Sequence, residues 1–184
     1  MRNTQGARLA MVTGLAAALA TLSACGNSHT AQPVAATVTT HVSRADRGWI
    51  DAAHQANMAE EQAGQLAQLI GATPAIQSAG AMLARDHQAL DNKLIPLAQK
   101  LKVTLPTSMT VQQITTGDRL SKEAGRQFDS DFTGSMMAAH LSMIAATRQE
   151  IARGSSPQVV NLARQALPVL IKHLTMMKAA AAAG

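Results

Sequence analysis

The chain has 184 residues and a formal net charge of +5; hydrophobic residues make up 47% of it, whereas aromatic residues make up only 2%. Sheet proteins favour aromatic and β-branched residues, so this alanine-rich composition predicts helices that pack closely through small side chains. The scarcity of rings and the absence of any run of Lys or Arg exclude a nucleic-acid partner bound by base stacking or by a phosphate-neutralising patch.

The first 25 residues form a separate segment. Arg2 and Arg8 precede a run of twelve largely apolar residues, 9–20. The sequence "LSAC" follows and ends in Cys25, the single cysteine of the chain. A membrane helix needs about 20 apolar residues, so this run is too short to span a bilayer and predicts a secretory signal instead. The "LSAC" ending resembles a bacterial lipobox, in which the cysteine becomes the acylated first residue of the mature protein.

This pattern predicts three parts: a lipoprotein signal peptide over 1–24, the acylated Cys25 with a flexible tether over 25–44, and a helical domain over 45–180. Gly26 follows the cysteine, whereas retention in the inner membrane usually needs Asp there. We therefore expect a membrane anchor at Cys25 and a location at the outer membrane, facing the periplasm. The alternative is an ordinary signal peptide with an incidental cysteine.

Apolar residues recur at helical spacing in the predicted domain. A first helix is expected from Trp49 to Ile70, where the "GATP" sequence ends it, and a second follows with Pro96 inside it, which predicts a kink or an early end. After Leu101 the pattern weakens into a crossover with a short helix. A third helix is expected over 129–153.

The sequence "GSSP" then repeats the earlier break, and a fourth helix follows with Pro168 inside it. Two helical hairpins joined by a crossover predict an all-α, up-down four-helix bundle. In that arrangement both G-x-x-P breaks lie at the same end of the bundle.

Each predicted helix carries one potential metal ligand on or beside its apolar face: Glu60, His87, His140 and His173. Each lies 11 to 16 residues from the adjacent break, so the four groups are expected at one level of the bundle. Polar groups in an apolar core cost several kcal/mol unless they satisfy one another. Three imidazoles and a carboxylate at one level indicate a site for a divalent transition metal.

Two other interpretations stay open. In the first interpretation, the same four residues form a buried hydrogen-bond network. In the second, thioethers join the imidazoles as Cu(I) ligands, because Met136 and Met143 flank His140, and Met177 follows His173 by one turn. Methionine is also an ordinary filler of helical cores.

The sequence contains no catalytic constellation, and we expect no enzyme. Di-iron bundles use Glu-x-x-His on two helices, and neither Glu60 nor Glu150 has a histidine three residues on. Asp51 and His54 come nearest to that motif, but the helical wheel places both on the outer arc of the first helix.

Four stretches, "WIDAAHQANMAEEQAGQLA", "MLARDHQALDNKL", "GRQFDSDFTGSMMAAH" and "LPVLIKHL", together resemble the bacterial Domain of Unknown Function 4142 family over residues 47–178. The resemblance implies a ferritin-like fold, secretion or lipid anchoring, and no established activity. The recurring polar positions of that family correspond here to Glu60, Asp86, His87, Asp129, His140 and His173. Among these, Asp86 and Asp129 are expected to support the ligands.

One position departs from the family pattern. The third helix usually carries an Asp-His pair, whereas Ala139 precedes His140 here, which removes one partner that could orient this histidine. The function expected from the sequence is therefore an envelope lipoprotein of unknown physiological role that binds a divalent transition metal. The alternative is a structural or protein-interaction module of the cell envelope that binds no metal.

Overall fold

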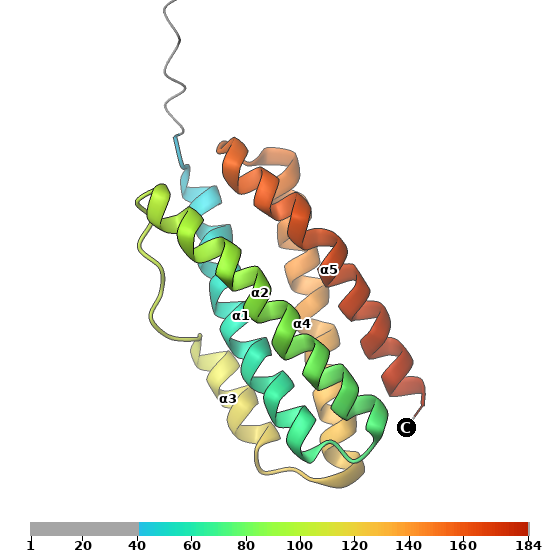
Figure 1. Cartoon of the computed structure of the whole chain (residues 1–184). Coiled ribbons are helices and arrows are strands. Elements are labelled where there is room, and N and C mark those ends of the chain that lie inside the picture. Colours follow the sequence, from blue (N-terminus) through green and yellow to red (C-terminus); the bar gives the residue numbers. More distant parts are fainter. Residues whose placement is uncertain (1–40, 184) are drawn as a thin grey trace, which may run out of the picture. The chain divides into compact units, whose positions relative to one another are not determined.

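The computed structural model describes residues 41–183, and this range contains five α-helices and no strand (Figure 1). The helices are α1 (Arg44–Ile70), α2 (Pro74–Lys100), α3 (Val111–Leu120), α4 (Gly125–Arg153) and α5 (Pro157–Ala182). The predicted signal peptide, Cys25 and most of the predicted tether lie outside the described residues. None of the described helices is long and apolar enough to span a membrane.

The two G-x-x-P sequences end one helix and start the next. Gly71 and Gly154 follow the last residues of α1 and α4, where the backbone amide of each glycine caps the helix. Thr73 and Ser156 then accept hydrogen bonds from the first turns of α2 and α5, and a proline occupies the first helical position of each. A hydroxyl at the N-cap and a proline after it are both favourable at a helix start.

The internal prolines do not end their helices. Of the two alternatives predicted at Pro96, the early end was wrong, because α2 continues to Lys100, and the kink stays a prediction; α5 likewise continues past Pro168. Pro96 lies in the last turns of α2, between the buried side chains of Leu94 and Ala98. We attribute the continuation to this packing, which holds the end of the helix in place although the proline has no amide hydrogen to donate.

The two breaks lie at opposite ends of the bundle, which corrects the up-down prediction. Asp46, at the start of α1, accepts a hydrogen bond of 2.8 Å from the amide of Ser155 in the α4–α5 break. Asp129, at the start of α4, accepts one of 2.9 Å from the amide of Ala72 in the α1–α2 break. The connection over 101–124, which contains α3, carries the chain back along the bundle, so α4 runs parallel to α2 (Figure 1).

The four candidate ligands share a level in spite of this different topology. The four long helices contain 27, 27, 29 and 26 residues, and each candidate ligand lies close to the middle of its helix. Reversing the direction of a helix leaves its midpoint at the same height, so the position of the middle residue does not depend on the order of the breaks.

This polar level divides the apolar core into two parts. One part surrounds Trp49, Ile50 and Leu94, and the other surrounds Phe128 and Phe132. The helices α1 and α2 approach so closely at Gly64 and Gly80 that a Cβ on either would lie about 2.6 Å or less from the carbonyl oxygen of the other. The helices that carry the polar groups are therefore fixed by packing on both sides of them.

A pair of buried carboxyl groups, Asp46 and Glu150, joins the start of α1 to the end of α4. Burial, together with a hydrogen bond to Asp46 and the charge of Asp46, raises the pKa of Glu150 to about 7. Burial alone would raise the pKa of Asp46, but hydrogen bonds from Ser43 and Ser155 lower it below its usual value. Asp46 therefore carries the charge and Glu150 carries the proton in mildly acidic solution.

We predict that replacing Glu150 by Gln removes part of the pH dependence of stability. The folded protein holds the Glu150 proton to about pH 7, whereas the unfolded chain loses it near 4.5. This proton stabilises the folded state fully below pH 4.5. The stabilisation, about 1–3 kcal/mol in the free energy of unfolding, is lost as the pH rises through 7.

Urea unfolding between pH 5 and pH 8 measures this effect. The free energy of unfolding of Glu150→Gln should fall less over this range than that of the wild type, while Glu61→Gln at the surface should follow the wild type. Parallel profiles for the wild type and Glu150→Gln would contradict the prediction.

Candidate metal centre

Three histidines from three different helices meet in the middle of the core. His87 comes from α2, His140 from α4 and His173 from α5, and their exposed fractions are 1%, 0% and 0%. The nitrogens available as ligands all lie within 4.8 Å of one another. The Nδ1 atom of His173 lies 3.3 Å from Nε2 of His87 and 3.2 Å from Nε2 of His140.

The second nitrogen of each ring faces a fixed acceptor outside the cluster. Nδ1 of His140 lies 2.9 Å from the carbonyl oxygen of Met136, and Nε2 of His173 lies 3.1 Å from the Asp86 carboxylate. Nδ1 of His87 lies 3.0 Å from Oδ1 of Asn57. A carbonyl, a carboxylate and an amide oxygen can only accept, so each of these ring nitrogens donates its hydrogen outwards.

The inward nitrogens of neutral rings therefore present lone pairs to one another at 3.2–3.3 Å. Lone pairs at this distance repel each other unless a proton or a cation lies between them. Ligands at about 2.0–2.1 Å from a tetrahedral Zn²⁺ are about 3.3 Å apart, which agrees with the two separations that Nδ1 of His173 forms. Outward donation by each ring is also how proteins orient imidazoles that bind metals.

Glu60 of α1 lies at the edge of the histidine cluster and is 2% exposed. Its Oε2 atom is 3.0 Å from Nε2 of His87 and 3.2 Å from Nδ1 of His140. Neither carboxylate oxygen makes a hydrogen bond of acceptable geometry, although both are buried. A buried carboxylate in this state is costly, and a cation beside Nε2 of His87 would satisfy it.

The electrostatic environment keeps two of the rings neutral. Burial lowers the pKa of the His173 imidazole to about 4, against the opposing effect of Asp86. Burial also lowers the pKa of the His140 ring, although the Glu60 charge acts in the opposite direction. Burial would raise the pKa of the Glu60 carboxyl, but the three neighbouring imidazoles, His87 first among them, bring it below its usual value. Neutral imidazoles and an ionised carboxylate are the forms that bind metals.

Asp86, which the sequence led us to expect as a supporting residue, contacts the imidazole of His173. Burial would raise the pKa of the Asp86 carboxyl, but hydrogen bonds from His173 and Arg85 bring it below the usual value. The structure places Asp129 elsewhere, at the α1–α2 break, where it binds the amide of Ala72 and touches none of the three histidines.

Sequence reasoning missed a chain of hydrogen bonds that supports His87. The Nδ2 group of Asn57 donates to Oδ1 of Asp91 over 3.2 Å, which fixes the amide so that its oxygen faces His87. His54 contacts the same Asp91 oxygen over 2.8 Å. The helical wheel placed His54 on the outer arc, but it is buried because α2 covers that side of α1. The spacing of Asn57, three residues before Glu60, was the available signal.

The thioethers of the Cu(I) interpretation are buried near the same level, with Met136 and Met143 flanking His140 on α4 and Met177 one turn after His173 on α5. They belong to the apolar core on either side of the histidines. Their positions agree with core packing as well as with a soft-metal site.

Comparisons with known proteins agree with this architecture. The family model described as "Domain of unknown function (DUF4142)" matches residues 30–180. A solved structure, the "Crystal structure of DUF305 fragment from Deinococcus radiodurans", superposes with a TM-score of 0.69 at 11% sequence identity, covering 78% of this chain and 99% of that chain. Identity this low shows a shared fold alone. None of the curated proteins matches the chain.

We predict that the outward hydrogen bonds fix the ring tautomers in the metal-free protein. His140 should carry its hydrogen on Nδ1, the less common form for a free imidazole, and His173 should carry it on Nε2. Long-range ¹H–¹⁵N spectra of the rings near pH 7 measure both, and exposed His41 serves as the unconstrained reference. A hydrogen on Nε2 of His140 would contradict the geometry.

Proposed function

The chain belongs to the family described as "Domain of unknown function (DUF4142)", and we propose that this member binds a divalent transition metal in the middle of its helical bundle. His87, His140 and His173 supply three ligands through their inward nitrogens, and Glu60 supplies the fourth. The observation that carries the proposal is that all three outward nitrogens face acceptors, which directs the remaining three nitrogens, all within 4.8 Å of one another, toward a shared ion.

The donor set favours a divalent metal over Cu(I). Three imidazoles and a carboxylate suit Zn²⁺, Fe²⁺ and neighbouring ions, whereas Cu(I) prefers thioether and thiolate sulfur. Ionised Glu60 also supplies a negative charge that offsets part of the charge of a divalent cation in a buried site.

We further propose that the domain is a lipid-anchored protein of the cell envelope, held through acylated Cys25 at the outer membrane and facing the periplasm. The basic n-region, the short apolar run and the "LSAC" sequence support this location. A long crossover between the second and third long helices supports assigning the fold to the ferritin-like type. The proposed role is binding rather than catalysis.

The competing proposal is a structural or protein-interaction module of the envelope, whose protein partner is unknown. In that case the same histidines form a buried network that specifies how the helices pack, and a metal plays no part. The hydrogen-bond chain from His54 through Asp91 and Asn57 to His87 favours this second reading, because it satisfies polar groups without any ion.

We predict that the full chain, purified without chelator or affinity metal, binds about one equivalent of Zn²⁺ or Co²⁺. Alanine substitution of His87, His140 or His173 should each abolish this binding, because each removes one of the converging nitrogens. Elemental analysis and calorimetric titration measure the stoichiometry, and His41→Ala provides a control histidine that is exposed and remote from the cluster.

The result that overturns the metal site is a folded wild-type protein that binds no divalent cation. If His87→Ala then lowers the midpoint of thermal unfolding without any effect of added metal, the structural module is supported instead. Tighter binding of Cu(I) than of Zn²⁺ would assign the site to the softer metal.

We also predict that Cys25→Ser abolishes acylation and releases the protein from the membrane fraction. Incorporation of labelled palmitate and fractionation of cells measure the two effects. Because Cys25 is the single cysteine, the substitution removes every thiol from the chain. Unchanged labelling, or an unchanged membrane fraction, would show that the anchor lies elsewhere.

A further inference from the structure

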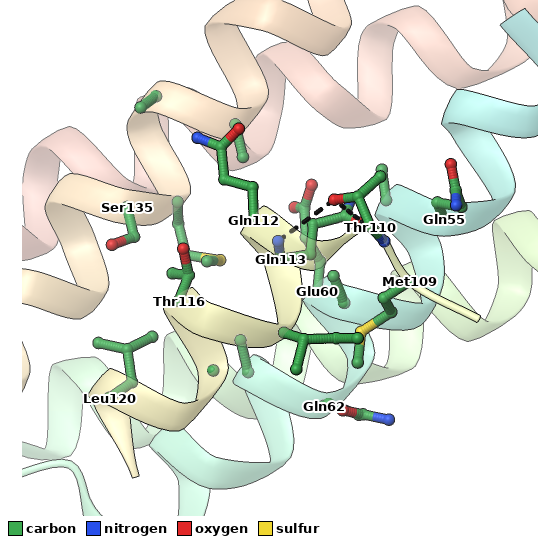
Figure 2. Close-up of a pocket in the computed structure, with 18 of the residues that line it drawn as sticks. Gln55, Glu60, Gln62, Met109, Thr110, Gln112, Gln113, Thr116, Leu120 and Ser135 are labelled. Atoms are coloured by element: carbon green, nitrogen blue, oxygen red, sulfur yellow. Dashed lines mark hydrogen bonds between the residues drawn. The ribbon is translucent and has the colours of Figure 1, made fainter. Parts of the chain in front are cut away.

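A cavity of about 730 Å³ lies between α1, α3 and α4, beside the proposed metal centre. Its walls consist largely of alanine, serine and threonine side chains and four glutamines. Figure 2 shows Gln113 and Thr116 of α3, Glu60 of α1 and Ser135 of α4 among the residues that line it. Small side chains on α1 and α4 create the space, and α3 covers it.

Glu60 belongs to both the cavity and the metal centre. It lines the cavity, and its Oε2 atom also lies 3.0 Å from Nε2 of His87. None of the three histidines lines this cavity. The Glu60 carboxylate therefore stands between the cavity and the inward nitrogens.

The charge of the cavity favours a cation. Among its described lining residues, only Glu60 and Asp118 are charged, and both are acidic. The glutamine side chains add amide oxygens, which are suitable partners for the water shell of a hydrated ion. Both oxygens of Glu60 are buried without a hydrogen-bond partner, so they are available to an arriving ion.

The second cavity that reaches the centre is a poorer path. It touches His87, but its volume is only about 20 Å³ and its walls are almost wholly apolar, with Leu90, Leu94 and Leu162 among them. A hydrated cation would have to give up its water there without any polar replacement, which is costly.

The cover over the large cavity is weakly attached. Leu120, the last residue of α3, is its only buried residue. Arg119 beside it holds that end, with Nη1 2.6 Å from the Asp131 carboxylate and Nη2 3.0 Å from the Ser135 hydroxyl. At the other end the side chain of Gln55 donates to the carbonyl oxygen of Ser108, just before α3. Segments with so few buried contacts open more readily than the core.

From these observations we infer that the cavity beneath α3 is the loading site for the metal. A hydrated divalent cation binds there first, at the Glu60 carboxylate, and Glu60 passes it to the three histidines as its water is replaced. This inference rests on the proposed metal-binding function. It adds a second cation position, a direction of entry and a role for α3 as the cover.

Two neighbouring threonines on α3 provide a matched test. Thr116 lines the cavity, whereas Thr115 is exposed and its hydroxyl binds the carbonyl oxygen of Val111. Mixing the metal-free full chain with Co²⁺ and following the visible absorbance of the bound ion measures the loading rate. Thr116→Trp should load about tenfold more slowly than Thr115→Trp, because the indole occupies part of the cavity and narrows the path to Glu60. Release to a chelator should slow equally, so the equilibrium affinity stays unchanged.

A second variant changes the rate in the opposite direction. Arg119→Ala frees the end of α3 from Asp131 and Ser135, so loading and release should both become faster than in the wild type while one equivalent of Co²⁺ is still bound. This variant keeps the test valid if Thr116→Trp does not fold, which circular dichroism establishes.

Each outcome separates the two proposals. If Thr116→Trp and Thr115→Trp load at the same rate, or if Arg119→Ala loads no faster than the wild type, the entry route is wrong and the metal centre is unaffected. If the wild-type protein binds no Co²⁺ at equilibrium, the proposed function itself fails, and the loading site fails with it.

Discussion

The convergence of three imidazoles in the middle of the core is the constraint on which the rest of the structure depends. The inward nitrogens of His87, His140 and His173 lie 3.2–3.3 Å apart in the two pairs that His173 forms, and all three side chains are buried. Such a group of polar atoms is stable only when every ring is oriented and every outer nitrogen is satisfied. Met136, Asn57 and Asp86 meet that requirement from three different helices.

The packing of the bundle serves this centre from both sides. Apolar clusters above and below the polar layer hold the four long helices, and the close contact between Gly64 and Gly80 fixes α1 against α2. Asp46 and Asp129 bind the backbone of the two breaks at opposite ends. The rings are therefore positioned by rigid helices rather than by loops, which is how a preorganised metal site is built.

Much of the fold could be predicted from local patterns. Apolar periodicity and the two G-x-x-P sequences predicted where the long helices begin and end. In each of these sequences a hydroxyl residue, Thr73 or Ser156, caps the helix that begins at the following proline. The direction of α4 was mispredicted, because helical periodicity is the same whichever way a helix runs. The path of the connection over 101–124 sets this direction, and the long-range hydrogen bonds of Asp46 and Asp129 show it. The burial of His54 was missed because the helical wheel identified only the apolar face of α1 as buried, whereas α2 also covers the adjacent face that carries His54.

The sequence by itself indicated an all-α domain in which each long helix carries one ligand-type side chain on or beside its apolar face near its middle, since these properties depend on residue spacing along single helices. The tertiary structure alone decided which nitrogen of each ring faces inwards, which acceptor fixes it, and where Glu60 stands between the cluster and the cavity. Those properties depend on the rotation and height of neighbouring helices, and no periodicity along one helix contains that information.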